Sequence, residues 1–110
     1  MRAFWGIFLL VGFSSVFYGR ALAATQFVYI SDASLVQYQT APDGLVYLRN
    51  INSFDANALG CCYNYFIDTN TIPGKNIFAM FLSFIPQGRG FWVGLSNGYA
   101  TGTINYSGNW

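Results

Sequence analysis

The sequence predicts a small α+β domain in which a curled antiparallel sheet, or a small barrel, packs against one central helix. Three observations favour this fold: short β-branched and aromatic runs between turn residues, one apolar segment of helical periodicity, and two strand-like runs after it. Several strands, then a helix, then two strands is an order typical of α+β domains. The sequence has no internal repeat, so residues 24–110 are expected to form a single β-rich domain.

Three segments before the helix are expected to be strands of the sheet. Residues 25–30 and 34–39 are short apolar and β-branched runs separated by Ser31 and Asp32, and both predict strands. After a loop at 52–60, the aromatic and β-branched content of 62–68 predicts a further strand.

A turn and an alternating segment link these runs. Residues 41–44, Ala-Pro-Asp-Gly, favour a turn because proline presets φ and glycine accepts a positive one. In 45–51, Val46 and Leu48 face one way, and the side chains that face the other way are Tyr47, Arg49 and Ile51. The two features together predict a hairpin.

The central helix is expected near 74–85. Thr71 is the candidate N-cap, and Pro73 is tolerated in the first turn, where its missing N–H is not needed. Pro86 and Gly88 then end the helix. Its apolar residues recur every three or four positions with few polar residues between them, so we expect most of its circumference to be covered. These residues are Ile77, Phe78, Phe81, Leu82, Phe84 and Ile85.

Two strands close the domain, at 91–95 and 103–106. In the first, Phe91, Val93 and Leu95 lie on one face and Trp92 lies on the other. Residues 96–98, Ser-Asn-Gly, predict the intervening turn, and Gly102 permits a bulge or bend.

The N-terminus predicts a cleaved signal peptide at 1–23. Arg2 precedes an apolar stretch at 3–18, and Ala21 and Ala23 occupy the small-residue positions before a cut. Cleavage after Ala24 is the close alternative. A retained membrane anchor is the other alternative, but the run is shorter than the roughly 20 residues that span a bilayer. We therefore expect a secreted or periplasmic protein without a transmembrane anchor after processing.

Removal of the signal peptide leaves few charges. Residues 24–110 carry three cations and four aspartates, a formal charge of −1. Nucleic acids and anionic membranes are held by arrays of Lys and Arg, so both are disfavoured as partners. A charge-poor, aromatic-rich chain of this size is expected to gain stability from a disulfide or from self-association, which favours a homo-oligomer.

Residues 74–93, GKNIFAMFLSFIPQGRGFWV, resemble the helix–Gly–strand unit of small secreted bacterial proteins related to the binding (B) subunits of pentameric toxins. That resemblance implies an OB-like barrel with one helix beside it. It also implies a non-enzymatic glycan-binding module assembled as a ring, with the helix of each subunit lining the pore. Those subunits join cysteines that are well separated in sequence, whereas the two cysteines here are adjacent.

Cys61 and Cys62 are candidates for a disulfide, and three states are open for them. They form a vicinal bridge, they bridge to another chain, or they stay reduced as small buried hydrophobic side chains. A zinc site is disfavoured because the chain has no histidine and only scattered aspartates. A thioredoxin-type motif needs two intervening residues. We therefore expect no metal and no cofactor.

Aromatic residues near polar ones form the second candidate site, for which the ligand is a neutral sugar. The C–H face of a sugar packs on a ring, and its hydroxyls take directional hydrogen bonds, for which Asn64, Asn97 and Asn105 are further candidates. The alternative is that these rings pack in the core or across strands. The candidate ligand-binding residues are Tyr63, Tyr65, Asp68, Trp92, Tyr99 and Tyr106, and Trp110 belongs to the same aromatic set. Asn105-Tyr106-Ser107 also matches a glycosylation acceptor, a short motif that carries no weight here.

These features disfavour an enzyme. Without histidine, Ser–His and Cys–His catalysis is excluded, and nothing in the spacing of the aspartates supports a carboxylate pair. The sequence therefore predicts a secreted, non-enzymatic binding module, a glycan- or receptor-binding subunit of an oligomer. The alternative is a structural or inhibitory envelope protein that binds one protein partner.

Overall fold

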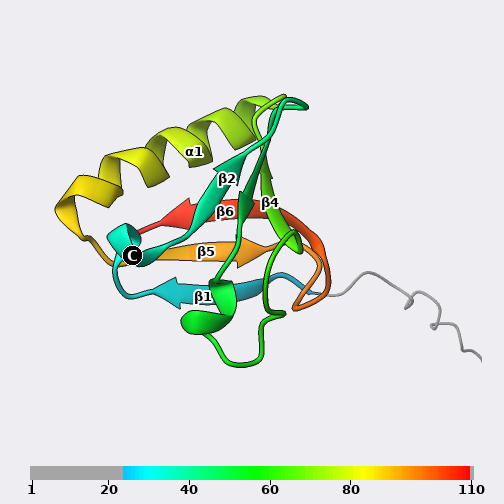
Figure 1. Cartoon of the computed structure of the whole chain (residues 1–110), viewed down its shortest axis with the longest axis vertical. Helices are drawn as coiled ribbons and strands as arrows, with labels where there is room; N and C mark the ends of the chain where they lie inside the picture. Colours follow the sequence, from blue (N-terminus) through cyan, green and yellow to red (C-terminus); the bar gives the residue numbers. More distant parts are fainter. Residues whose placement is uncertain (1–23, 110) are drawn as a thin grey trace, which may run out of the picture.

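A six-stranded sheet and helix α1 make up the described part of the chain, residues 24–109 of this computed structural model. The predicted signal peptide at 1–23 and Trp110 lie outside the described residues. The sheet order is β1-β5-β6-β4-β3-β2, and α1 lies across one side of it (Figure 1). The elements are β1 (Gln26–Ile30), β2 (Tyr38–Thr40), β3 (Leu45–Leu48), β4 (Tyr65–Asp68), α1 (Ile72–Phe84), β5 (Phe91–Leu95) and β6 (Gly102–Gly108).

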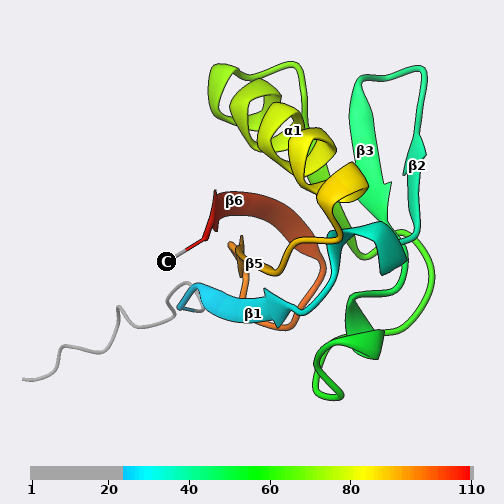
Figure 2. The ribbon, with the colours of Figure 1, turned by 90° about the vertical axis from the view of Figure 1, so that its left-hand side faces the viewer.

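The sheet is mixed because of the way β6 pairs, and it is open because its two edge strands do not pair with each other. β6 lies between β5 and β4, antiparallel to β5 but parallel to β4. The other neighbouring strands are antiparallel, and β1 and β2 form the two edges. From the side, the β2–β3 hairpin stands beside α1 and the strands β1, β5 and β6 lie below it, so the sheet curls strongly around the helix (Figure 2). The predicted α+β class with one central helix is confirmed, with a curled mixed sheet in place of an antiparallel one or a barrel.

The core lies between the concave side of the sheet and one face of α1. Buried and accessible residues alternate along β1, β3 and β4, as the period of a strand requires. Ile77, Phe81 and Phe84 lie four and three positions apart, so they share the helix face turned to the sheet. Burial of a side chain as large as Phe81 stabilises the fold by roughly 1.5–3 kcal/mol. The largest fully buried side chains are Tyr65, Phe81, Phe91, Ile30, Ile51, Ile67, Leu95, Val28 and Val93.

Local signals set the two ends of α1, as predicted. Thr71 is the N-cap, and its Oγ1 accepts a hydrogen bond of 3.0 Å from the Gly74 N–H. Pro73 lies in the first turn. After Phe84 the chain tightens into a 3-10 turn, and Gly88 ends it with a φ of +58°, which glycine adopts without strain. The helix begins two residues before the predicted start at 74.

The apolar surface of α1 is only partly covered by its own chain. Ile72, Met80 and Leu82 are 76%, 38% and 41% exposed. The expectation that most of the circumference is covered is therefore not met within one chain.

Two predicted strands are shorter than expected. In the 34–39 run, Asp32 Oδ1 accepts hydrogen bonds from the Ser34 N–H and Oγ, which closes a 3-10 turn at Ala33–Leu35 and delays β2 to Tyr38. In the 62–68 run, the strand begins only at Tyr65.

The 45–51 segment also ends early. β3 stops at Leu48, and Ile51 turns into the core in a 3-10 helix instead of continuing the face of Tyr47. The predicted hairpin itself is confirmed: β2 and β3 pair through the turn at 41–44, where Gly44 has a φ of +87°.

Candidate functional site

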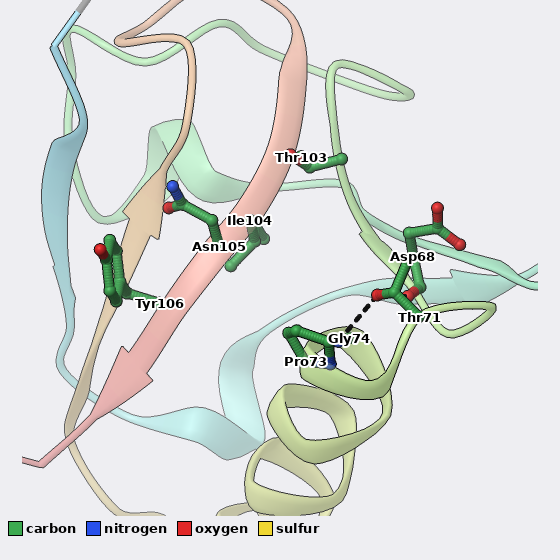
Figure 3. Close-up of a pocket in the computed structure, with 8 residues that line it drawn as sticks. All are labelled: Asp68, Thr71, Pro73, Gly74, Thr103, Ile104, Asn105 and Tyr106. Atoms are coloured by element: carbon green, nitrogen blue, oxygen red, sulfur yellow. Dashed lines mark hydrogen bonds between the residues drawn. The ribbon is translucent and has the colours of Figure 1, made fainter.

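A groove lies where the start of α1 approaches β6. Figure 3 shows its lining side chains coming from both elements and from the end of β4. Its volume is about 330 Å³. We call it the α1–β6 groove, and it is lined by Asp68, Thr71, Pro73, Gly74, Thr103, Ile104, Asn105 and Tyr106. Asp68 and Tyr106, both predicted ligand-binding residues, therefore lie in one cavity.

The groove exists because β4 and β6 pair over a short distance only. Their parallel pairing joins Tyr65 with Gly102 and Phe66 with Thr103, and the strands then separate. The chain leaves β4 through the turn at Asp68 and enters α1, whose first turn approaches the Asp68 carbonyl closely at Gly74. A side chain at position 74 would overlap that carbonyl, so the absence of a Cβ allows the helix to start there.

A β-bulge in β6 places two neighbouring side chains on the same face of the sheet, at the border of the groove. Leu95 pairs with Ile104 and Gly94 pairs with Tyr106, which leaves Asn105 as the extra residue. A bulge of this kind brings consecutive side chains toward the same side of a sheet, whereas a regular strand alternates them. Asn105 is exposed and Tyr106 is 54% exposed, so an amide and a ring face are accessible together.

Hydrogen bonds within the chain fix some polar groups of the groove and leave others accessible. Asn70 donates to Asp68 Oδ1 from its backbone and side-chain nitrogens, each at 3.0 Å. Thr71 Oγ1 donates to the Asp68 carbonyl at 2.8 Å, and Thr103 Oγ1 pairs with Ser96 Oγ at 2.8 Å. The second carboxylate oxygen of Asp68 takes no part in these bonds, and the side chain of Asn105 is exposed.

The groove adjoins an aromatic surface on the outer face of β1, β5 and β6. Phe27 and Tyr106 have ring centroids 5.8 Å apart, and Gly94 lies between them in the pairing register. Tyr29 and Trp92 are neighbours in the same register, at 5.1 Å. Trp92, another predicted candidate, therefore lies on the surface that continues from Tyr106. We define the aromatic surface as Phe27, Tyr29, Trp92 and Tyr106.

Phe27 and Tyr29 were not among the predicted site residues. Their signal is nonetheless present in the sequence, because they alternate with the buried Val28 and Ile30 and therefore share the outer face of β1. The side chains on that face are 40% and 47% exposed.

Tyr65 and Tyr99, two further candidates, belong to an internal hydrogen-bond chain. The Tyr65 hydroxyl accepts from the Leu59 N–H at 2.8 Å and donates to the Tyr99 carbonyl at 2.6 Å. The Tyr99 hydroxyl donates to Asp55 Oδ2 at 2.6 Å. This hydrogen bond, with partial burial and the negative charge of Asp55, raises the pKa of Tyr99. Both tyrosines hold loops together, and neither lines the groove.

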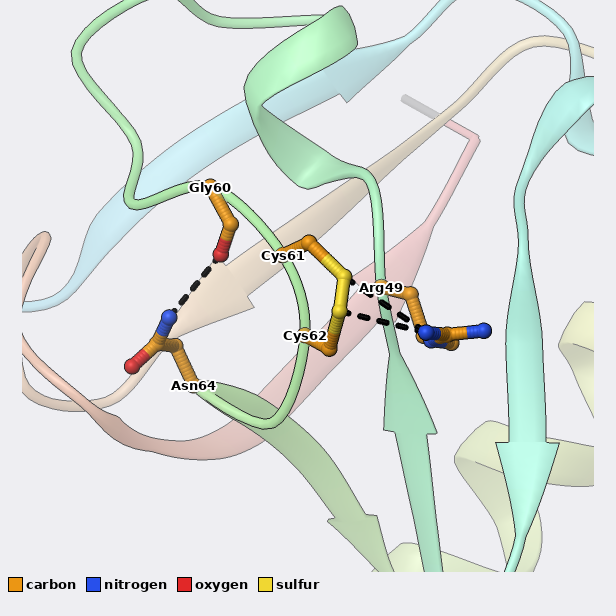
Figure 4. The surroundings of a disulfide bond; sticks show 5 residues. All are labelled: Arg49, Gly60, Cys61, Cys62 and Asn64. Carbon is orange, nitrogen blue, oxygen red and sulfur yellow. Dashed lines mark hydrogen bonds between the residues drawn. A yellow bond between two sulfur atoms is a disulfide. The ribbon is translucent and has the colours of Figure 1, made fainter.

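Tyr63, the remaining candidate, lies on a separate surface beside the cysteines. Its ring is 54% exposed, meets the Tyr47 ring edge-on at 5.1 Å, and has the Arg49 guanidinium 5.9 Å from its centroid. Of the three open states of the cysteines, the structure contains the vicinal disulfide between Cys61 and Cys62, across a cis peptide bond (Figure 4).

Within residues 24–109, no group of three or more metal-ligating side chains is assembled. In the same range, no helix combines the length and apolar character needed to cross a membrane. Comparisons with protein-family models, with curated proteins and with solved structures find no match for this chain. The resemblance of 74–93 to toxin binding subunits therefore stays a prediction.

Proposed function

We propose that this chain is an exported, non-enzymatic binding module that takes a neutral glycan in the α1–β6 groove. The observation that supports this most is the cavity of about 330 Å³ whose lining includes Asp68, Asn105 and Tyr106. This volume is at the lower end of the roughly 300–1,000 Å³ typical of small-molecule sites.

The chemistry of the groove suits sugar hydroxyls. The exposed ring of Tyr106 offers a face for sugar C–H groups. The carboxylate of Asp68 accepts hydrogen bonds from hydroxyls, and the amide of Asn105 both donates and accepts. An aspartate in the groove disfavours acidic sugars, because a like charge would be brought close to it. A neutral glycan is therefore the preferred ligand class.

The aromatic surface supports a ligand longer than one sugar. It starts at Tyr106, one of the residues that line the groove, and continues through Phe27 to the Tyr29–Trp92 pair. Residues two apart on a strand are about 6.6 Å apart on the same face. Successive sugar rings of an oligosaccharide can thus pack along this surface while one of them fills the groove.

The test is a screen of neutral and acidic glycans with the purified protein, followed by calorimetric titration of the strongest hit. Tyr106→Ala should weaken binding by roughly tenfold, since an aromatic contact contributes about 0.5–1.5 kcal/mol beyond its buried area. Tyr63→Ala is the matched control, because both side chains are 54% exposed and Tyr63 lies outside the groove. Absence of any glycan hit, or equal losses in the two variants, would contradict the proposal.

Export is part of the same proposal. The disulfide between Cys61 and Cys62 supports it, because disulfides persist in oxidising compartments and are rare in the cytosol. We expect the intact mass of the secreted protein to correspond to a chain that begins at Ala24. A cytosolic protein that retains Met1 would contradict it.

A second candidate function is binding to one protein partner through the uncovered side of α1. The observation that favours it is the exposure of Ile72 and Leu82. Co-purification of one stoichiometric partner, lost in Leu82→Gln and without glycan binding, would favour this function over the first. A second copy of the chain is the partner expected for a homo-oligomer.

A further inference from the structure

The two cysteines of the disulfide differ in exposure, and one of the two sulfur atoms lies closer to a cation. Cys61 is exposed, whereas Cys62 is partly buried. Arg49 Nη2 lies 3.5 Å from Cys61 Sγ and 3.1 Å from Cys62 Sγ, as Figure 4 shows. The two sulfurs therefore differ both in access and in electrostatic surroundings.

The Arg49 guanidinium has unused hydrogen-bonding capacity at this position. Disulfide sulfur is a weak acceptor, and Arg49 Nε is buried without a hydrogen-bond partner among the described residues. A thiolate at Cys62 would offer a charged acceptor to the same guanidinium, and charge-assisted hydrogen bonds are about twice as strong as neutral ones. Arg49 is thus placed to stabilise a Cys62 thiolate more strongly than it stabilises the intact disulfide.

Hydrogen bonds hold the loop around the disulfide independently of the bridge. Asn64 Nδ2 donates to the Gly60 carbonyl at 2.9 Å, and Asn64 Oδ1 accepts from Thr101 Oγ1 at 2.9 Å. The Gly102 N–H donates to the Asn64 carbonyl at 2.9 Å. Both ends of the loop are therefore fixed by bonds that an opened bridge would leave in place.

From these contacts we infer that Cys61–Cys62 is a thiol–disulfide exchange site for an external thiol. The thiolate attacks Sγ of the more exposed cysteine, Cys61, and forms a new S–S bond to it. The Cys61–Cys62 bond breaks, its electron pair leaves on Cys62 Sγ, and Arg49 stabilises that thiolate. The proton of the attacking thiol goes to solvent, and no further oxidant or reductant is required.

This activity is independent of glycan binding, because none of the residues involved lines the α1–β6 groove. The chemistry recognised is a thiolate, carried by a small molecule or by a protein. Neither source requires a change in the position of the loop, since Cys61 is already accessible.

The test incubates the oxidised secreted protein with glutathione, or with a short peptide that contains one cysteine, and then quenches the reaction with excess iodoacetamide. Fragmentation between the two cysteines in the mass spectrometer locates each group. We expect the mixed disulfide on Cys61 and the alkyl group on Cys62. Reaction with both thiols, or with the peptide alone, supports the inference and identifies the thiol source. Reaction with neither, or the adduct on Cys62, overturns it.

Arg49→Gln should slow the exchange roughly three- to tenfold, because a leaving thiolate without a neighbouring cation leaves more slowly. Arg89→Gln is the matched control, since Arg89 lies 5.3 Å from the Phe84 ring at the other end of the fold. If Arg49→Gln does not fold, as judged by near-ultraviolet circular dichroism, Arg49→Lys tests the same point by retaining the charge. An exchange rate in Arg49→Gln equal to that of Arg89→Gln overturns the role of Arg49.

Discussion

Tyr99 connects the loop after β5 to the loop before β4 through its hydroxyl. The hydrogen bond to Asp55 raises its pKa above the usual value of 10.0. A raised folded-state pKa means that the folded chain holds this proton more tightly than the unfolded chain. The stabilisation is therefore fully present below about pH 10 and is lost as the pH rises through the folded-state pKa.

Tyr99→Phe should lower the free energy of unfolding at neutral pH, and the difference from wild type should shrink above about pH 10. Urea unfolding across neutral and alkaline pH measures this difference. Tyr106→Phe is the control, because it removes the hydroxyl of an exposed ring. A constant difference between wild type and Tyr99→Phe at all pH values would show that the Asp55 contact does not carry the effect.

A substitution of Asp68 tests the polar contribution of the groove to glycan binding. Asp68→Asn preserves the size of the side chain, but an amide is a weaker acceptor for sugar hydroxyls than a carboxylate, so glycan binding should weaken roughly three- to tenfold. Asp43→Asn is the control, because Asp43 Oδ1 accepts from the Leu45 N–H in the turn before β3, in a similar role outside the groove. Calorimetric titration distinguishes them, and equal affinities would exclude Asp68 from the site.

At the scale of elements, the contact between α1 and β4 determines the shape of the groove. Gly74→Ala should destabilise the fold by roughly 1–3 kcal/mol, because the added Cβ overlaps the Asp68 carbonyl. Gly60→Ala is the control, since its added Cβ would come no closer than 3.6 Å to Asn52. Thermal unfolding measures both, and equal midpoints would mean that α1 does not need this close approach.

The elements that depend on local signals are those that the sequence predicts well. Alternation places Val46 and Leu48 in the core, and Thr71 with Pro73 starts the helix. The turn at Asp32 contradicts the predicted strand at 34–39 because a side chain bonded to nearby backbone competes with strand pairing. The parallel pairing of β4 with β6 could not be predicted, since no local pattern specifies which distant strands become neighbours.

For the candidate site, the sequence predicted some of the residues but not the groove that they line. Composition and residue type suggested Asp68 and Tyr106, and the structure brings them together. The bulge at Asn105 and the gap between β4 and β6 arise from pairing register, so the groove itself was not visible in the sequence. Tyr65 was selected for its ring, but its position on the inward face of β4 places it in the core.

At the scale of the whole molecule, the outer surface of α1 bears on assembly. If a homo-oligomer forms there, Leu82→Gln should shift the protein toward monomer in sedimentation experiments, because a polar side chain would replace buried apolar area in the interface. Leu59→Gln is the matched control, since both leucines are 41% exposed and Leu59 lies in the loop before β4. A wild-type protein that remains monomeric at high concentration would contradict assembly.

The two proposed activities lie at separate places in the molecule. The α1–β6 groove and the Cys61–Cys62 loop share no lining residue, so each can be removed without the other. Reduction of the disulfide should therefore leave glycan affinity within about twofold, because the hydrogen bonds of Asn64 hold the loop next to β6 without the bridge. Titration before and after reduction checks this, and loss of binding would show that the two regions are coupled.

An amide-resolved NMR titration with the tightest-binding neutral glycan tests the location of the site most directly. The account predicts the largest shift changes at residues 68–74 and 103–106, with smaller ones along Phe27, Tyr29 and Trp92. Changes concentrated in the 60–64 loop or on the outer side of α1, with the groove unaffected, would contradict it.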